Sequence, residues 1–195
     1  MSTVPESFYL AGIPPEYHGA TLMPGLQAVL KGKPSAAYLH GAPGTGKTHQ
    51  AWAMVLHWRR RIFADHYRRA DQWESGRECL DRMERDRDAL PRRVLIITES
   101  ADLRRHRHDR EWLDGVAKHA GWLVVDDIGF TAPDTWVIEA VYHLANERRA
   151  WKRPTLWTSN LTPAELATTF SPAIASRLSG DQIVTMGGHD RRVAP

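Results

Sequence analysis

The sequence predicts an α/β fold of three layers, in which a parallel five-stranded sheet lies between helices. Short continuous apolar runs, such as residues 94–98, recur along the chain and are typical of strands buried on both faces. Between them, apolar residues recur at three- and four-residue spacing, as in amphipathic helices that join parallel strands. Glycine-rich or acidic residues follow two of the runs directly, at the strand ends where a parallel sheet forms its ligand crevice.

The composition is that of an ordinary globular domain. Of the 195 residues, 42% are hydrophobic and 25% are charged, and the length is enough for one domain with a sizeable core. No apolar run approaches the roughly 18 residues that span a bilayer, and the N-terminus lacks the regions of a secretory signal. Cys79 is the only cysteine, which excludes an internal disulfide and fits a reducing compartment. We therefore expect a cytoplasmic protein with no membrane partner, whose net charge of +3 permits nucleic-acid binding without arguing for it alone.

An N-terminal arm precedes the core. Prolines and glycines between residues 8 and 22 exclude a long helix there, residues 25–31 form a short predicted helix, and residues 32–35 break it. We assign residues 1–34 to this arm and helix, and residues 35–195 to the core.

A glycine-rich motif follows the first predicted strand, residues 36–39, and a helix is expected from residue 50 through residue 62. The segment between them matches the pattern G-x-x-x-x-G-K-[ST] at every fixed position, and its glycines let backbone N–H groups point at phosphate oxygens. Lys47 is expected to reach the β- and γ-phosphates of ATP, and Thr48 to ligate Mg²⁺. An extended arm ahead of such a loop either borders the adenine base or simply packs on the sheet. The predicted nucleotide-binding residues are Gly41, Ala42, Pro43, Gly44, Thr45, Gly46, Lys47 and Thr48.

Residues 61–91 are dense in both charge signs and predict one or two amphipathic helices, which form an insertion before the second strand at 94–98. Their charges form either a solvated face or a surface for DNA or a partner. Arginines and histidines then gather between residues 104 and 110. The histidine spacing matches no metal site, so we interpret this run, like the one near Arg59, as a basic surface that could contact nucleic acid.

Two carboxylates follow the apolar strand at residues 121–125. In a parallel sheet such an end faces the ligand crevice. Asp126 is predicted to hold Mg²⁺, directly or through water, because a hard cation prefers oxygen ligands. Asp127 is predicted to orient and deprotonate the water that attacks the γ-phosphate. The alternative is an acidic turn without a chemical role, and the complete phosphate-binding motif earlier in the chain argues against it.

The C-terminal part supplies the remaining elements. Apolar spacing predicts a helix over residues 135–149, whose basic end suits a helix C-terminus. The strand at residues 155–158 leads to Asn160, whose side chain could touch the γ-phosphate and the attacking water. Thr162 and Glu165 predict a capped helix start. A short helix at residues 171–178 and a fifth strand at residues 182–186 complete the fold, with no helical lid domain expected after them.

Together, these motifs resemble the AAA+ ATPases of the DnaC/IstB group, the bacterial and phage helicase loaders and transposition helpers related to DnaA. The resemblance covers roughly residues 8–190. The phosphate-binding loop is shared with many NTPases, whereas the proline-rich opening and the Asp-Asp-Ile-Gly form are more particular to this group. The matching segments are residues 12–17 with 20–22, 41–48, 123–129, 158–160 and 176–178.

The resemblance implies a P-loop NTPase fold of the AAA+ kind and a role for two further residues. Asn160 is similar to the sensor at the end of the fourth strand. Arg177 looks like the arginine finger that reaches the γ-phosphate of the neighbouring subunit, which implies a homo-oligomer, a ring or an open spiral. The arm is then expected to border the adenine. Helicase loaders usually carry a helicase-gripping domain ahead of the core, and the insertion at 61–91 is longer than the family's usual link, so it is expected to replace that surface.

The expected function is that of an ATP-binding and ATP-hydrolysing DNA-replication accessory protein, similar to a helicase loader, that uses Mg²⁺ and binds single-stranded DNA as an oligomer. Two alternatives stay open. One is an IstB-like transposition helper, with a transposase in place of the replicative helicase as partner. The other is a nucleotide-switched binding protein or inhibitor of replication initiation without significant turnover, because Asp127 stands where many relatives place glutamate.

Overall fold

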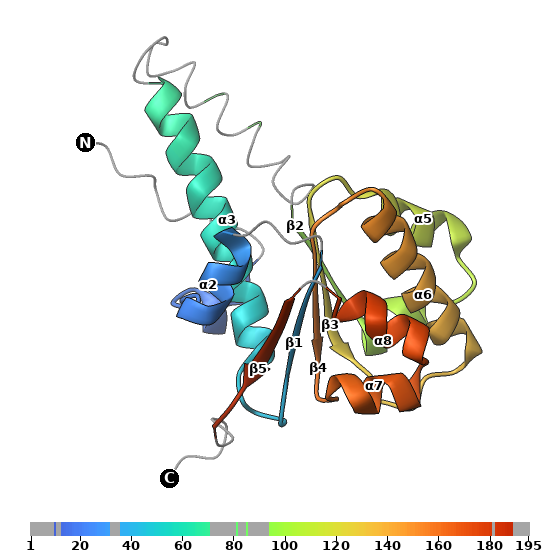
Figure 1. The fold of residues 1–195 in the computed structure, drawn as a ribbon. Coiled ribbons are helices and arrows are strands. Elements are labelled where there is room, and N and C mark those ends of the chain that lie inside the picture. Colours follow the sequence, from blue (N-terminus) through green and yellow to red (C-terminus); the bar gives the residue numbers. More distant parts are fainter. Residues whose placement is uncertain are drawn as a thin grey trace.

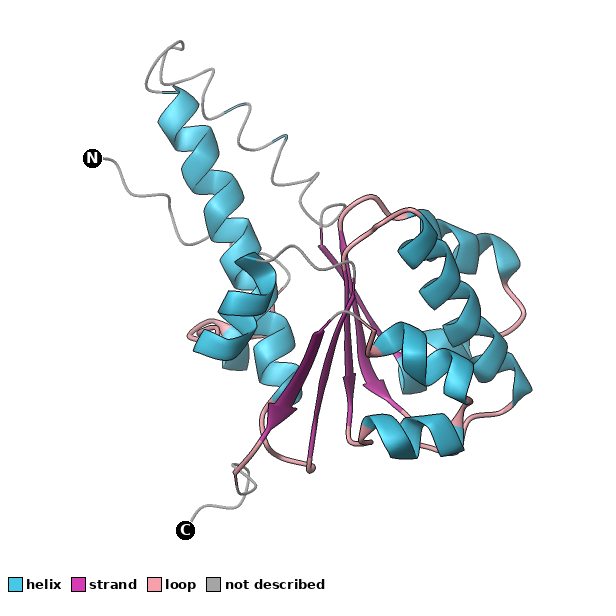
Figure 2. Cartoon of the chain, viewed as in Figure 1, coloured by secondary structure: helices cyan, strands magenta, loops and turns pink. Residues whose placement is uncertain are grey.

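The computed structural model contains one parallel sheet of five strands (Figures 1 and 2). The structure describes residues 10, 13–31, 36–70, 81, 85, 94–180 and 182–188. The strands lie in the order β2-β3-β4-β1-β5 across the sheet. The predicted α/β fold with five parallel strands is therefore confirmed. The strands are β1 (Ala36–Gly41), β2 (Val94–Thr98), β3 (Trp122–Ile128), β4 (Thr155–Ser159) and β5 (Gln182–Met186).

Helices cover both faces of the sheet and make the three layers (Figure 1). On one face lie α2 (Pro24–Lys31) and α3 (Lys47–Ala70). The short helix η1 (Pro15–Tyr17) precedes α2. The other face carries η3 (Glu99–Leu103), α5 (Arg110–Lys118), α6 (Thr135–Ala150), α7 (Pro163–Thr169) and α8 (Pro172–Leu178).

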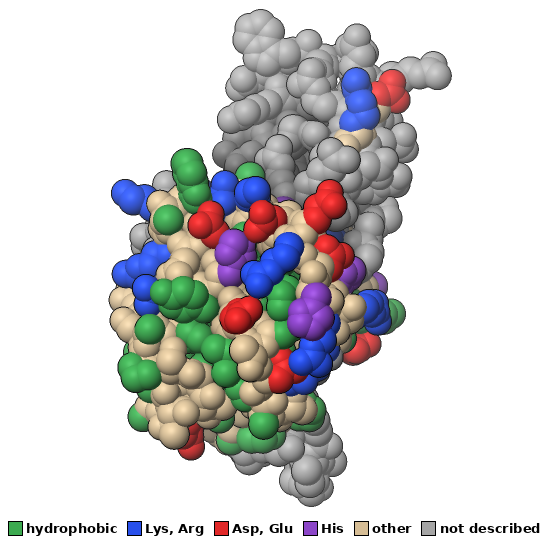
Figure 3. Space-filling view, turned by 90° about the vertical axis from the view of Figure 1, so that its right-hand side faces the viewer, with side chains coloured by type: hydrophobic (Ala, Val, Ile, Leu, Met, Phe, Trp, Pro, Cys, Tyr) green, Lys and Arg blue, Asp and Glu red, His purple; other side chains and the backbone are tan. Residues whose placement is uncertain are grey.

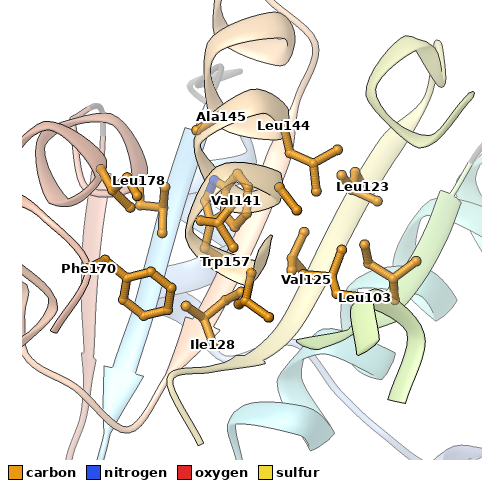
Figure 4. Packing of buried hydrophobic residues seen from close by; sticks show 14 of the residues in the cluster. Leu103, Leu123, Val125, Ile128, Val141, Leu144, Ala145, Trp157, Phe170 and Leu178 are labelled. Carbon is orange, nitrogen blue, oxygen red and sulfur yellow. The ribbon is translucent and has the colours of Figure 1, made fainter. Parts of the chain in front are cut away.

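Successive side chains of each strand point to opposite faces of the sheet, so the interior consists of two hydrophobic cores, one on each face. On β1, Tyr38 packs toward α5–α8 while its neighbour Leu39 packs toward α3, and Leu123 and Val124 divide in the same way on β3. Figure 4 shows Trp157 of β4 packed beneath α6 in the larger of these clusters. A parallel strand buried on both faces needs apolar residues at consecutive positions, which is why the runs in the sequence are continuous.

Polar side chains cap the starts of α6 and α7, and both helices begin where the sequence predicts a helix. Thr162 accepts from the N–H of Glu165, whose carboxylate accepts in return from the Thr162 N–H, which is a complete capping box. Asp134 caps α6 by accepting from Val137 N–H at 3.0 Å. These caps satisfy N–H groups that have no partner within the helix, and they fix where α6 and α7 begin.

Two boundaries differ from the prediction. Helix α3 continues to Ala70, so residues 61–70 of the expected insertion belong to it, whereas residues 71–80, 82–84 and 86–93 lie outside the described residues. Strand β3 continues through both aspartates to Ile128, with an irregular register between Val125 and Ile128. Of the described residues, none forms a helical lid after β5, and no described helix is long and apolar enough to cross a bilayer.

Candidate nucleotide-binding and hydrolysis site

The glycine-rich loop connects β1 to α3 at the carboxyl edge of the sheet. Gly46 has φ 96°, a left-handed conformation that a residue with a Cβ rarely adopts, and α3 begins at the next residue. The backbone therefore turns sharply enough to present its N–H groups, together with the N-terminus of α3, to one space. Such a helix start favours bound phosphate.

Lys47 is buried inside this loop. Its ammonium Nζ donates to the carbonyl oxygens of Gly41 at 2.8 Å and Ala42 at 2.9 Å. The lysine thus lies across the opening of the loop, where a phosphate group could replace these carbonyls as acceptor. This position is what the motif requires of Lys47.

Asp126 joins the loop to β3 and β4. Its carboxylate is only 5% exposed and accepts from Thr48 Oγ1 at 2.9 Å through one oxygen and from Thr158 Oγ1 through the other. Neighbouring ligands of an octahedral Mg²⁺, each about 2.1 Å from the ion, lie about 3 Å apart. The oxygens of Thr48 and Asp126 therefore fit a shared magnesium ion.

Asp127 has an unusual backbone for a residue with a side chain. Its φ is 63°, and its N–H donates to Thr158 Oγ1 at 2.9 Å. With Lys47, Thr48 and Asn160, it lines the pocket above the phosphate-binding loop. The structure thus brings the residue at the carboxyl end of β3 and the residue after β4, both predicted from the sequence to act in hydrolysis, into one pocket.

The N-terminal arm reaches the same pocket. Tyr17 lines it, and the ring of Tyr17 stacks on Trp52 of α3, with 5.6 Å between ring centroids and 14° between planes. His49 meets the same ring edge-on. Of the two alternatives for the arm, the structure favours the one in which it borders the nucleotide pocket.

Arg177 does not line this pocket. It lies on α8, where its guanidinium donates to Asn146 and to the Ala173 carbonyl at 2.9 Å and sits 4.9 Å from the ring centre of Tyr142. A second hollow, between α6 and α8, is lined by Arg177 and Arg149. Within one chain, Arg177 is thus separate from the pocket of Asp127.

Glu99 and Thr158 are site residues that the sequence analysis did not single out. Glu99 follows β2 directly, and its side chain is fully buried, which raises its pKa. Thr158 bridges the two aspartates. Glu99 stands immediately after a predicted strand, as the aspartates do, so the same strand-end argument could have identified it.

Several arginines of the two basic runs are buried or paired with carboxylates. Arg59 is buried, and desolvation lowers its pKa. Arg107 pairs with Asp134 at 2.8 Å and Arg110 with Glu139 at 3.3 Å, and Figure 3 shows carboxylates among the cations of this face. Arg59 itself is therefore not exposed for phosphate contact, but Arg60 and Arg61 of the same run are exposed, so DNA contact near Arg59 stays a prediction. Among the described residues, no group of three or more His, Cys, Asp or Glu side chains could hold a metal ion.

Comparison with known proteins finds similarity of structure. No protein-family model matches the chain, and no curated protein matches it in sequence. The crystal structure of DnaI superposes with a TM-score of 0.62 at 21% identity, over 93% of this chain and 95% of DnaI. The DnaC helicase loader superposes with a TM-score of 0.60 at 17% identity, over 89% and 100% of the two chains.

The replication initiator DnaA bound to AMPPCP and single-stranded DNA also superposes, with a TM-score of 0.60 at 17% identity. The match covers 91% of this chain but only 52% of that DnaA chain. At these identities the likeness establishes the fold alone, an α/β core of the P-loop NTPase kind that this chain shares with DnaI, DnaC and DnaA.

Proposed function

We propose that this protein, which shares its fold with DnaI, DnaC and DnaA, binds ATP with Mg²⁺, hydrolyses it, and serves DNA replication in the cytoplasm as a helicase-loader-like accessory. One observation carries the proposal. The hydrogen bond from Thr48 to Asp126, at 2.9 Å, joins the phosphate-binding loop to the acidic end of β3. A loop that binds phosphate and an acid that holds magnesium have a joint use in phosphoryl transfer.

The residues that the sequence marks at this site divide the work in the proposal. The loop residues 41–46 and Lys47 bind the phosphates, while Thr48 and Asp126 hold Mg²⁺, which when bound neutralises charge on the phosphate oxygens. Asp127 orients and deprotonates the attacking water, and Asn160 contacts the same water and the γ-phosphate. Tyr17 borders the adenine.

Two substitutions test the proposal. Lys47→Ala removes the buried cation, so we expect no measurable ATP binding or turnover. Asp127→Asn keeps the size of the side chain but not its basicity, so we expect ATP affinity within about twofold and turnover lower by at least about 100-fold. Steady-state phosphate release and a fluorescent-nucleotide titration measure the two quantities. Unchanged turnover in both variants would reject the hydrolysis mechanism.

The same measurement separates the alternatives. If the wild-type protein binds ATP but releases no phosphate above the blank with saturating single-stranded DNA, a nucleotide-switched binding protein replaces the ATPase. For the client, a pull-down with replicative helicase and with transposase decides between a loader and a transposition helper. We favour the helicase because two of the similar structures are named as a helicase loader and a replication initiator.

The proposal includes assembly and DNA binding. Arg177 does not line the pocket of its own chain but a separate hollow, so its role as a finger requires a second copy. Single-stranded DNA is proposed because the fold matches that of a DnaA bound to it, and because the turn between α6 and β4 carries the exposed Trp151 beside the guanidinium of Arg153.

A further inference from the structure

A buried carboxylate lies beside the proposed hydrolysis residue without lining the nucleotide pocket. Glu99 is the first residue after β2, and its side chain has no exposed surface. One carboxylate oxygen accepts from the N–H of Gly129 at 2.5 Å, and the other from Arg104 at 3.1 Å. Burial raises the pKa of Glu99, the Gly129 N–H and Arg104 lower it, and the charge of Asp127 raises it again, so the two acids interact.

The turn that contains Asp127 needs support from its surroundings. Asp127 and Gly129 have φ values of 63° and 76°, on either side of Ile128. A residue with a side chain holds a left-handed conformation only where neighbouring groups fix it. From the β4 side, Thr158 accepts from the Asp127 N–H at 2.9 Å, and Ser159 Oγ donates to the Ile128 carbonyl at 2.5 Å.

Glu99 supplies the support from the opposite side. Its bond holds Gly129 beside the start of η3, so the turn is fixed from β4 at Asp127 and from η3 at Gly129. Arg104 extends the support along the chain, since it also donates to Thr131 Oγ1 at 2.5 Å and to the Ala132 carbonyl at 3.4 Å. Glu99 and Arg104 together thus hold the segment that follows Asp127.

We propose that the Glu99–Arg104 pair is a positioning device for Asp127, in which Glu99 binds the Gly129 amide and so fixes the direction of the Asp127 carboxylate toward the pocket. Only Glu99 of this pair is buried, and the cost of removing a carboxylate from water makes such an ion pair a poor source of stability. Its presence here is better explained by the geometry that it imposes. The proposal rests on the proposed hydrolysis, and it adds residues to that mechanism that touch neither nucleotide nor water.

The first test measures the support without any need for turnover. Hydrogen exchange of the full chain compares the wild type with Glu99→Leu, which provides an apolar side chain but no acceptor for the Gly129 N–H, and with Arg104→Gln. We expect the amide of Gly129 and its neighbours to exchange at least about tenfold faster in both variants, with amides of α3 unchanged. Arg104 is one-third exposed, so its variant provides the measurement if Glu99→Leu does not fold. Unchanged exchange at residues 127–131 would overturn the proposal.

The second test measures positioning. We expect turnover to fall by at least about tenfold in each variant, with ATP affinity within about twofold, because a displaced base affects the transition state and not ground-state binding. The double variant is expected to be no slower than the slower single variant, since the two residues act as a unit. Glu139→Gln breaks an exposed pair with Arg110 on the same face and serves as the control.

Equal losses of affinity and turnover, or none, would overturn the positioning role. A wild type without turnover would reject the proposed hydrolysis and with it the catalytic purpose of the pair. In that event the exchange experiment still decides whether Glu99 holds the turn, so the two failures are distinguishable.

Discussion

Arg148 shows how a single buried cation connects several segments. It is 1% exposed and pairs with no carboxylate among the described residues, and burial lowers its pKa to about 10. Its guanidinium donates to Thr155 Oγ1 at 2.7 Å and to the carbonyls of His119, Gly121 and Pro154, each at 2.8 Å. The end of α5, the entry to β3 and the start of β4 are thus held by one side chain.

Replacing Arg148 tests this role. Arg148→Met keeps much of the volume but leaves buried carbonyls without donors, so we expect the free energy of unfolding to fall by about 3 kcal/mol. Urea denaturation measures it. Arg110→Met, which removes an exposed arginine, is the control and is expected to cost less than about 0.5 kcal/mol. Equal effects of the two substitutions would contradict the assignment.

At the residue scale, the sequence predicted side chains whose role follows from a local motif and missed those whose role needs a neighbour. Lys47, Thr48 and Asp126 follow from their place after a strand. Thr158 and Glu99 act on the turn of β3 from β4 and β2, which flank it. That order across the sheet is not readable from periodicity, so their contacts could not be predicted.

At the scale of elements, the strands were predicted well because burial on both faces leaves a continuous apolar run. The C-terminal end of α3 was not predicted, because the last residues of the helix are rich in charge and no glycine or proline marks its end. For the same reason Arg59 was expected on a surface. The helix instead turns it into the protein, where its long side chain is buried.

The α6–β4 turn is the element on which DNA binding is best tested. Trp151 is 68% exposed, and the guanidinium of Arg153 lies 5.5 Å from its ring centre, with Lys152 between them in sequence. An exposed aromatic ring among cations can stack a base and contact phosphates. Lys152 has φ 49°, a left-handed backbone conformation that turns the chain between α6 and β4.

We expect Trp151→Ala to weaken binding of a fluorescent single-stranded oligonucleotide by about tenfold. Lys152→Glu is expected to weaken it and to reduce the dependence on salt by about one counterion. Arg110→Glu introduces the same charge change away from the turn and should leave the affinity within about twofold. If all three variants bind as the wild type does, DNA does not use this turn.

At the scale of the whole molecule, the strand order explains why distant residues meet. Strand β4 lies between β1 and β3, so the phosphate-binding loop, Asn160 and the aspartates share one edge of the sheet. Arg177 lies on the helical layer instead, in a separate hollow. One chain thus carries a pocket and, at another place, a candidate finger for the pocket of a second copy.

Mixing variants tests this arrangement. Arg177→Ala is expected to lower turnover by at least about 100-fold, because the γ-phosphate loses a cation. Adding inactive Lys47→Ala subunits should restore part of the activity, since they supply an intact Arg177 to a neighbour with an intact loop. Arg110→Ala is the matched control. A mixture no more active than its components, or a fully active monomer, would contradict action between subunits.

The central claim is that Thr48 and Asp126 hold one magnesium ion beside the phosphate-binding loop. Calorimetric titration of ATP with Mg²⁺ and with EDTA measures how much the ion strengthens binding. We predict a clear strengthening in the wild type that is lost in Thr48→Ala and in Asp126→Ala, while binding without Mg²⁺ changes little. The same strengthening in all three proteins, or no ATP binding by the wild type, would contradict the account.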